Sequence, residues 1–308
     1  GAGPGGAPSG RLQGVEHEGE KTMGKIVIVG SGPAGCSAAL YAARAGQEVV
    51  VISMGMGTLS KAELIQNYYG FEEGITGAEL YRRGVAGAKA VGAEFITAEV
   101  VGLDYAATLV VQTTEGDYPA DAVILATGAG RIAPKIAGLA EHEGRGVSYC
   151  ATCDAFFYRG KTAAVLGSGE YALHEVQALL PLAGRVILCT NGEPLTADFP
   201  EGVEICTEKL AAVEGEEKVS ALRLENGERL RGEGRFVALG VAGSAALARK
   251  LGAPVENGRI VVDEKMQTGI PGLYAAGDCT GGLLQVCKAV YEGALAATEA
   301  IKQIRGKK

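Results

Sequence analysis

Short apolar runs, each followed by a glycine-rich turn and a segment of helical pattern, recur along the chain. Residues 25–29 (KIVIV) are an almost unbroken apolar run, which is typical of a strand buried on both faces. An Ala-rich segment to about Ala45 predicts a helix, and residues 48–52 predict the next strand. Further strands are expected at 122–126, 162–166, 185–189 and 236–240, and helices at about 78–91, up to Leu182, and at 283–304. This alternation predicts an α/β fold with parallel sheets.

Two finer patterns add to this outline. Short alternating strands are expected over about 203–239, with Asn226-Gly227 as a hairpin turn. On the last helix one face carries six apolar residues that we interpret as core packing: Val286, Val290, Ala294, Ala297, Ile301 and Ile304.

Two of the glycine turns stand between a predicted strand and a predicted helix. The first, residues 30–35 (GSGPAG), fits G-x-G-x-x-G, whose glycines let the backbone approach a pyrophosphate at the helix N-terminus. The second, residues 167–172 (GSGEYA), repeats the pattern. The strand after the first turn ends at Ser53 instead of the acidic residue that would bind a ribose 2′-OH, which argues against NAD at this site. The chain therefore carries two Rossmann-like units.

These units suggest a division of the chain into domains. We expect a disordered tail at residues 1–24, a first domain formed by 25–127 together with 241–308, and a second domain, 128–240, inserted in the first. The strands near 122–128 and 236–240 would connect the two domains. The long irregular stretch from Met54 to Phe71 predicts a loop that covers a ligand.

Composition narrows the class of protein. The chain has 308 residues, 47% of them hydrophobic and 21% charged, and 48 glycines, which suit many tight strand-to-helix turns. A net charge of −7 argues against nucleic acid as a partner. No apolar run reaches the roughly 18–20 residues that a membrane span needs, and no signal peptide is evident. We therefore expect a soluble cytoplasmic protein that does not contact a membrane.

The pair Cys150 and Cys153, followed at once by Asp154, carries the candidate chemistry. Two cysteines at this spacing can close a small reducible disulfide ring, often at the start of a helix whose dipole lowers the pKa of a thiol. Asp154 could move a proton as the ring opens and closes, or cap the helix. The pair could also be half of a zinc site, but the chain has only three histidines and no second Cys-x-x-Cys. We favour redox chemistry and expect no metal.

From about residue 25 to 305 the chain resembles the low-molecular-weight thioredoxin reductases. The most specific matches are residues 150–154 with the aromatic residues 156–158 behind them, the turn 30–35, and residues 275–278. The resemblance implies a homodimeric flavoprotein whose FAD reduces the disulfide. It implies Cys153 as the sulfur beside the flavin, Cys150 as the sulfur that attacks a thioredoxin-like partner, and Asp154 as the acid/base. We expect FAD contacts at Gly30, Gly32, Pro33, Ala34, Gly35, Asn67, Thr127, Gly128, Gly277, Asp278 and Gln285.

One departure from that family concerns the electron donor. Members that use NADPH carry a cluster of the form His-Arg-Arg-x-x-x-Arg that binds the 2′-phosphate, whereas residues 189–195 here contain no basic residue and one acid, Glu193. Losing two charged hydrogen bonds of about 1.5–3 kcal/mol each would weaken NADPH binding roughly a hundredfold to ten-thousandfold. Glu170 also stands where a pyrophosphate would arrive.

Members without the arginine cluster include ferredoxin-dependent flavin thioredoxin reductases, which residues 284–286 and the short loop near 190 favour. We therefore expect electrons from a ferredoxin-type protein. An acidic donor needs a basic docking surface, for which the candidates are Arg82, Arg83 and Lys89, or Arg159 and Lys161. The alternatives are weak use of NADPH or NADH, a flavin dithiol oxidase, and a redox sensor without turnover.

The five other cysteines, Cys36, Cys189, Cys206, Cys279 and Cys287, are interpreted as small apolar core residues. Cys279, next to Asp278, is the one that we would test for a second redox role.

Overall fold

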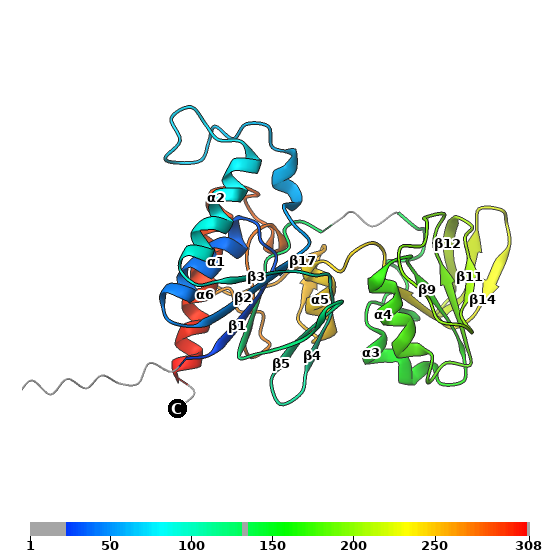
Figure 1. Cartoon of the computed structure of the whole chain (residues 1–308). Coiled ribbons are helices and arrows are strands. Elements are labelled where there is room, and N and C mark those ends of the chain that lie inside the picture. The colour runs from blue at the N-terminus through cyan, green and yellow to red at the C-terminus, as the bar shows by residue number, and fades with distance from the viewer. Residues whose placement is uncertain (1–22, 131–134, 307–308) are drawn as a thin grey trace, which may run out of the picture.

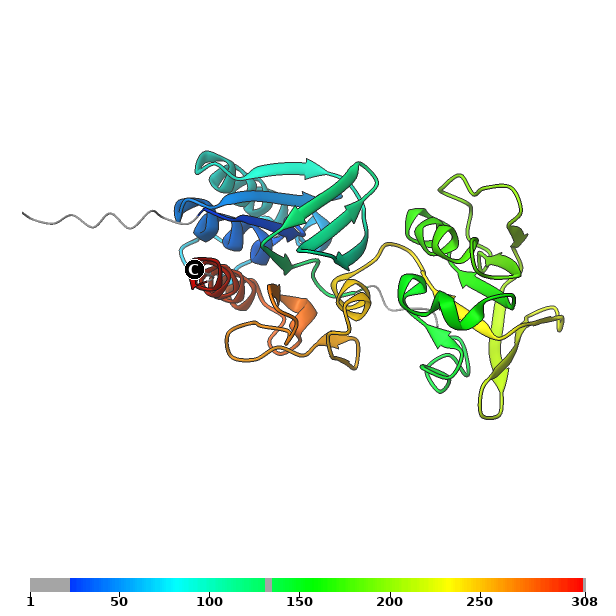
Figure 2. The same cartoon turned by 90° about the horizontal axis from the view of Figure 1, so that it is seen from below.

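A computed structural model describes residues 23–130 and 135–306 of the chain. The expected tail, residues 1–24, lies almost wholly outside the described residues. Figure 1 and Figure 2 show two lobes. The chain leaves the first lobe after β7 (Ala122–Leu125), the fourth strand of that lobe's parallel sheet in chain order, and returns to it after β15 (Gly234–Val237).

The first lobe is built on a five-stranded parallel sheet in the order β18-β7-β1-β2-β3. Its other strands are β1 (Lys25–Val29), β2 (Glu48–Ser53), β3 (Glu94–Thr97) and β18 (Leu273–Ala275). Every residue of β7 and β18 is buried, because both faces of the sheet are covered. Strands from both ends of the chain therefore share one sheet.

Three helices cover one face of this sheet: α1 (Pro33–Arg44), α2 (Gly77–Ala90) and α6 (Val286–Gly306). Helix α6 begins three residues later than predicted, and its predicted buried face is only partly right. Val286, Val290 and Ala294 are half-buried, whereas Ala289, Gly293 and Ala296 are buried. The reason is close packing on α1, since a Cβ at Gly293 would lie 2.1 Å from the carbonyl oxygen of Ala34. Small residues, and not the large apolar ones, face the partner helix.

The opposite face of the sheet packs on an antiparallel sheet of β4 (Val100–Tyr105), β5 (Leu109–Thr113) and β6 (Gly116–Ala120). The lobe is completed by the short elements η1 (Gly57–Lys61), α5 (Ser244–Lys250), β16 (Val255–Glu256), β17 (Arg259–Ile260) and η3 (Asp278–Thr280). Between η1 and α2 the chain projects from the lobe and is held at its base by paired backbone hydrogen bonds between Ile65 and Ile75 of 2.8 and 2.9 Å.

The second lobe contains another five-stranded parallel sheet, in the order β11-β10-β9-β15-β8. The strands are β8 (Val147–Ser148), β9 (Thr162–Leu166), β10 (Arg185–Cys189), β11 (Glu204–Cys206) and β15. An antiparallel sheet of β12 (Leu210–Gly215), β13 (Val219–Leu224) and β14 (Arg229–Arg231) packs against one face, and α3 (Ala151–Asp154), η2 (Ala155–Tyr158) and α4 (Glu170–Leu179) lie at the other. Asn226-Gly227 forms the predicted turn between β13 and β14, where Gly227 has a φ of +88°.

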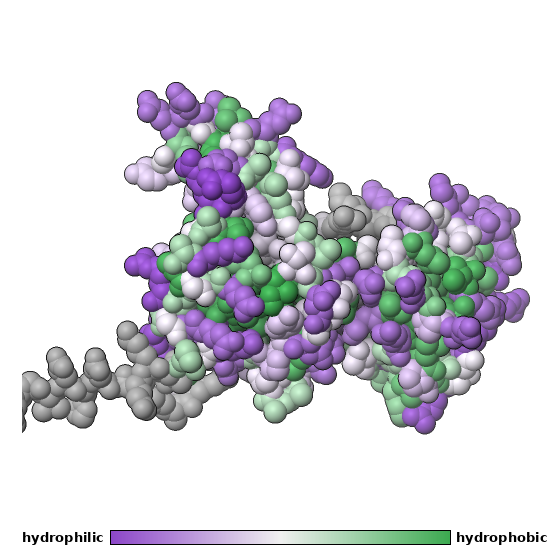
Figure 3. All heavy atoms as spheres, in the orientation of Figure 1, coloured by the Kyte–Doolittle hydropathy of each residue, from purple (hydrophilic) through white to green (hydrophobic). Residues whose placement is uncertain are grey.

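Each lobe thus contains a parallel sheet in which one strand is followed by a glycine turn and a helix. This confirms the predicted α/β fold with two Rossmann-like units. Within residues 23–130 and 135–306, no helix is both long enough and apolar enough to cross a membrane. Figure 3, drawn in the orientation of Figure 1, shows hydrophobic patches among hydrophilic residues on the surface of both lobes.

Candidate active site

Cys150 and Cys153 are joined by a disulfide bond, with their Cα atoms 5.3 Å apart. Cys150 follows β8 and caps the one-turn helix α3, and its Sγ accepts a hydrogen bond from the backbone N–H of Cys153 at 3.2 Å. Cys150 is buried, while Cys153 is exposed on the side that faces the first lobe, where its Sγ lies 3.3 Å from the carbonyl oxygen of Lys250. The disulfide therefore lies at the contact between the lobes, and the helix predicted to follow the first cysteine is present.

Asp154 is tied to the disulfide turn through a residue that the sequence did not point out. Ser148 Oγ donates a hydrogen bond to Asp154 Oδ2 at 2.6 Å and accepts one from the backbone N–H of Cys150 at 3.1 Å. The Asp154 carboxylate is half-buried. Ser148 thus ties this carboxylate to the backbone of the turn that carries the disulfide.

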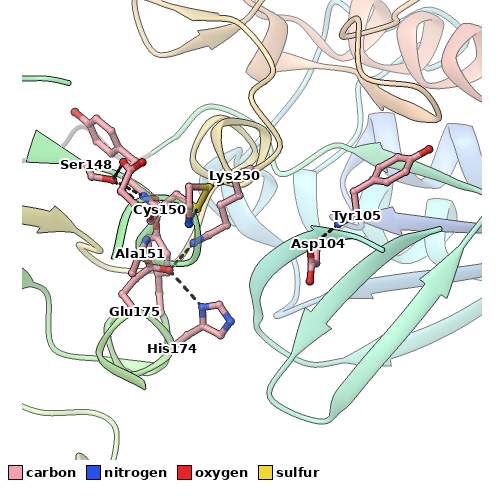
Figure 4. The surroundings of a disulfide bond; sticks show 12 residues. Asp104, Tyr105, Ser148, Cys150, Ala151, His174, Glu175 and Lys250 are labelled. Atoms are coloured by element: carbon pink, nitrogen blue, oxygen red, sulfur yellow. Dashed lines mark hydrogen bonds and ion pairs between the residues drawn. A yellow bond between two sulfur atoms is a disulfide. The ribbon is translucent and has the colours of Figure 1, made fainter. Parts of the chain in front are cut away.

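A buried charged cluster lies beneath the disulfide (Figure 4). Glu175 of α4 accepts a hydrogen bond from the backbone N–H of Ala151 at 2.5 Å and one from His174 Nδ1 at 3.3 Å. Lys250, the last residue of α5 in the first lobe, donates to the same carboxylate. The side chains of Glu175 and Lys250 are 0% and 2% exposed. One carboxylate thus connects the disulfide turn, the second lobe and the first lobe.

The electrostatics of this cluster favour an ionised Glu175. Burial by itself raises the pKa of a carboxyl group, but the hydrogen bonds from His174, Lys250 and the Ala151 N–H outweigh burial and lower the pKa of Glu175 below its usual value. The buried negative charge is thus paired with the ammonium group of Lys250. Sequence reasoning missed all three side chains because they come from segments far from the cysteines in the chain.

The first glycine turn has the shape that a dinucleotide requires. A Cβ at Gly30 would lie 2.2 Å from the carbonyl oxygen of Ala126, and one at Gly35 would lie 1.8 Å from that of Gly30, so packing alone demands these two glycines. Gly32 differs, because a Cβ there would have no atom within 4 Å. The space above Gly32, at the N-terminus of α1, is open for a pyrophosphate.

Other expected cofactor contacts come together from distant parts of the chain. Asn67 Nδ2 donates to Gln285 Oε1 at 2.9 Å across 218 residues of sequence. Thr127 Oγ1 accepts from the backbone N–H of Ser244 at 2.8 Å, and Ser244 Oγ accepts in turn from the Thr127 N–H at 3.0 Å. The remaining residues take these places: Pro33 and Ala34 in the first turn of α1, Gly128 after β7, and Gly277 and Asp278 after β18. These five residues come directly after the carboxyl ends of β1, β7 and β18, the edge at which the parallel sheets of α/β folds bind ligands.

The second glycine turn has no such opening. A Cβ at Gly169 would lie 2.9 Å from Thr196 Oγ1, and the backbone N–H of Thr196 donates to the carbonyl oxygen of Ser168 at 2.9 Å. The N-terminus of α4 is also occupied, because the half-buried carboxylate of Glu99 from the first lobe lies near the Tyr171 N–H and Glu170. Burial, with Glu170 nearby, raises the pKa of Glu99. The position of a second pyrophosphate is thus filled by side chains of the chain itself.

The fold and the site together define the class: a disulfide oxidoreductase with two dinucleotide-type units, one open and one filled. Residues 24–293 match the family model described as pyridine nucleotide-disulphide oxidoreductase, and the chain belongs to this family. The thioredoxin reductase of Aquifex aeolicus is 34% identical over 92% of this chain and 94% of its own length.

Solved structures agree with this family. The atypical thioredoxin reductase TRi from Desulfovibrio vulgaris Hildenborough is 40% identical, with a TM-score of 0.86 over 92% of this chain and 98% of its own. A ferredoxin-flavin thioredoxin reductase from Clostridium acetobutylicum is 36% identical, with a TM-score of 0.70 over 92% of this chain and 99% of its own. The protein is accordingly an FAD-dependent disulfide oxidoreductase of the thioredoxin reductase type.

Proposed function

We propose that this enzyme reduces a thioredoxin-like disulfide through Cys150 and Cys153 with electrons from a ferredoxin-type protein and not from NADPH. The observation that carries the proposal is the filled second glycine turn, where Thr196 covers Gly169 and Glu99 occupies the N-terminus of α4. A pyrophosphate would have to displace one side chain and approach a carboxylate. The absence of basic residues over 189–195 removes the 2′-phosphate contacts as well.

The open turn of the first lobe is our proposed FAD site. Gly32 and the N-terminus of α1 would hold the pyrophosphate, and the Asn67–Gln285 pair would contact the flavin end. We propose residues 25–127 with 241–308 as the FAD domain and 128–240 as the inserted domain. When bound, FAD supplies the two electrons that cleave the disulfide.

The chain's own groups handle the protons and the partner. Opening the Cys150–Cys153 bond to two thiols consumes two protons, and in our proposal Asp154, which Ser148 holds, delivers one of them. In our proposal, Cys150 then attacks the partner's disulfide as a thiolate and Cys153 resolves the mixed disulfide, which releases the reduced partner. Because Cys150 is only 5% exposed, this attack requires the disulfide turn to move away from the first lobe.

The partner would dock beside Cys153. Phe156 and Phe157 are each 67% exposed, and the guanidinium of Arg159 stacks 5.3 Å from the ring centroid of Phe156. Exposed aromatic rings bordered by a cation are typical of protein-binding surfaces. As the docking surface for the acidic electron donor, we favour Arg159 and Lys161. The other candidates, Arg82, Arg83 and Lys89, belong to α2.

On α2, Arg82 and Arg83 both form ion pairs with Glu79, at 2.7 and 2.8 Å, which reduces the net positive charge of that surface. Lys89, at the end of the same helix, lies 5.6 Å from the ring centroid of Phe95.

We also propose a homodimer formed through the exposed aromatic residues of the first lobe. Tyr41 on α1 and Tyr291 on α6 are 55% and 64% exposed on two helices that pack together. Tyr41→Glu with Tyr291→Glu should give a monomer in analytical ultracentrifugation. Tyr105→Glu, at an exposed position on β4, serves as the control.

An anaerobic experiment tests the donor and the acceptor separately. The FAD-loaded enzyme is mixed with NADPH, NADH or a reduced ferredoxin, and loss of the visible flavin absorption is followed together with new thiols on thioredoxin. We expect reduced ferredoxin alone to give both signals. In Cys150→Ser the flavin should still be reduced while no thiols form.

Rapid bleaching by NADPH would show that the donor assignment is wrong. A flavin that is reduced but gives no thiols in the wild type would show that the reductase assignment is wrong.

A further inference from the structure

A second pair of cysteines lies at the far edge of the second lobe. Cys189 is the last residue of β10 and Cys206 the last residue of the edge strand β11, and the two are direct partners in the parallel register. Both belong to the sheet face that packs against β12–β14, and their thiols lie close enough to shift each other's pKa in opposite directions. Adjacent strands lie about 4.8 Å apart, within the roughly 4.4–6.8 Å between Cα atoms that a disulfide spans.

We propose that Cys189 and Cys206 are a second redox-active site, which reacts with a small neutral hydroperoxide and closes into a disulfide between β10 and β11. The site is separate from Cys150–Cys153, because β11 and β8 lie at opposite edges of the five-stranded sheet. The proposal does not depend on which electron donor serves the flavin.

The two sulfurs have different surroundings, which gives them different roles. Cys206 is half-buried, and hydrogen bonds from Cys189 and the Glu208 N–H lower its pKa to about 6, against burial and the carboxylates of Glu208 and Glu228. Cys189 is fully buried, and donating that hydrogen bond raises its pKa well above the usual value despite the guanidinium of Arg235. Cys206, the more exposed and more acidic thiol, is therefore the nucleophile, and Cys189 is the resolving thiol.

The reaction balances in two steps. The Cys206 thiolate attacks one oxygen of the hydroperoxide, the O–O bond breaks, and the leaving oxygen takes a proton, giving a sulfenic acid on Cys206 and water or an alcohol. Cys189 then attacks the sulfenic sulfur, its proton leaves with the hydroxyl group as water, and the disulfide forms. The two thiols lose two electrons, and the peroxide bond accepts them.

The chemistry of the site also selects the oxidant. The carboxylates of Glu208 and Glu228 lie near enough to Cys206 to act on its charge, so they disfavour a negatively charged oxidant such as an anionic disulfide. A small neutral hydroperoxide avoids this repulsion and can reach a half-buried sulfur. The site stands beside the loop that would bind a 2′-phosphate in an NADPH enzyme, since the Thr190 N–H donates to the carbonyl oxygen of Cys206 at 2.9 Å.

The other free cysteines provide internal comparisons. Cys279, which the sequence suggested as a second redox residue, is buried, and desolvation raises its pKa to about 11. Cys36 is similar, with its pKa raised to about 12 by burial. Cys287 is exposed and free. Neither buried thiol should react, whereas Cys287 should be modified by alkylating reagents without forming an internal bond.

Mass spectrometry of the full-length, FAD-loaded protein tests the site directly. The protein is treated with a slight excess of hydrogen peroxide, alkylated under denaturing conditions and digested. We expect the peptides of Cys189 and Cys206 to be recovered linked, with the loss of two hydrogens, and separated again by a dithiol. Recovery of both cysteines in alkylated form, or of Cys206 linked to any other cysteine, would overturn the proposal.

Two variants separate the roles of the thiols. With Cys189→Ala the reaction should stop at a sulfenic acid on Cys206, which a sulfenic-acid-specific reagent such as dimedone traps as one adduct per chain. With Cys206→Ser no adduct should form at Cys189. In the wild type, alkylation of Cys206 should persist as the pH falls to about 6. A dimedone adduct on Cys189 in place of Cys206 would contradict the proposal that Cys206 is oxidised first. The mass measurement on the wild type tests the disulfide even if a variant fails to fold.

Discussion

The ammonium group of Lys250 in the first lobe forms a buried ion pair with the carboxylate of Glu175 in the second lobe. The same carboxylate holds the backbone N–H of Ala151, the residue next to Cys150. The contact between the lobes and the position of the disulfide turn therefore both depend on the Glu175 carboxylate. If the disulfide turn moves away to reach its partner, this pair must break in every cycle.

Replacing Lys250 with Met should leave the buried negative charge of Glu175 without its ammonium partner. Removal of one partner of a buried ion pair costs about 3–5 kcal/mol. We expect a lower Tm and slower reduction of the disulfide by the reduced flavin, measured by calorimetry and stopped-flow absorbance.

The double variant Lys250→Met with Glu175→Gln removes both charges and should recover more than half of the lost stability. An unchanged Tm in Lys250→Met would contradict a buried, paired charge. Lys302→Met, on an exposed ammonium group paired with Glu299, is the matched control.

The lowered pKa of Glu175 predicts how stability depends on pH. Because its folded-state pKa lies below the unfolded value, its ionised form stabilises the fold above the ordinary carboxyl range, and this contribution is lost as the pH falls through the folded pKa. The difference in unfolding free energy between wild type and Glu175→Gln should be constant near neutral pH. It should decline only below about pH 4.3, the ordinary glutamate pKa. A rise in this difference as the pH falls from neutral would instead indicate a raised pKa.

Asp154→Asn should slow the protonation of the opened disulfide while leaving the disulfide itself intact. Loss of a positioned acid/base typically costs about a hundredfold to ten-thousandfold in rate. Ser148→Ala should have a smaller effect, about tenfold, because it removes only the group that orients Asp154. The measurement is thioredoxin reduction against pH. Ser220→Ala, at an exposed serine of β13, should match the wild type, and an equally active Asp154→Asn would remove Asp154 from the mechanism.

Two glycines of the first turn should behave differently. Gly32→Val places its side chain in open space, so the apoprotein should keep its Tm while the Kd for FAD rises at least about tenfold, or 1.4 kcal/mol. Gly35→Ala collides with the Gly30 carbonyl and should lower the Tm of the apoprotein. Normal FAD affinity in Gly32→Val would place the cofactor elsewhere.

The filled second turn predicts which changes would create a nucleotide site. Thr196→Ala with Glu99→Gln clears the turn, and Asn191→Arg with Glu193→Arg supplies phosphate contacts. Two charge-assisted hydrogen bonds of about 1.5–3 kcal/mol each should tighten NADPH binding at least about a hundredfold. Flavin bleaching under anaerobic NADPH reports the result. The first two changes alone should have little effect, and bleaching by the unaltered protein would contradict the proposed donor.

Local patterns in the sequence were enough for much of this protein. The apolar runs, the two glycine turns and the Cys-x-x-Cys predict the main strands, the starts of the two helices that follow the glycine turns, and the disulfide. Each of these depends on neighbouring residues whose spacing follows backbone geometry. The missing basic residues at 189–195 pointed to an unusual donor for the same reason. The tail at residues 1–24 and the domain boundaries stay predictions.

Only the tertiary structure assigned the residues that act across distance. Lys250 meets Glu175 across 75 residues of sequence, Thr196 covers Gly169, and Cys189 stands beside Cys206, through contacts that no local periodicity encodes. The buried face of α6 was likewise decided by how closely α1 approaches it. A sequence shows which groups are available and how neighbours are spaced, whereas burial and charge pairing arise when distant segments pack.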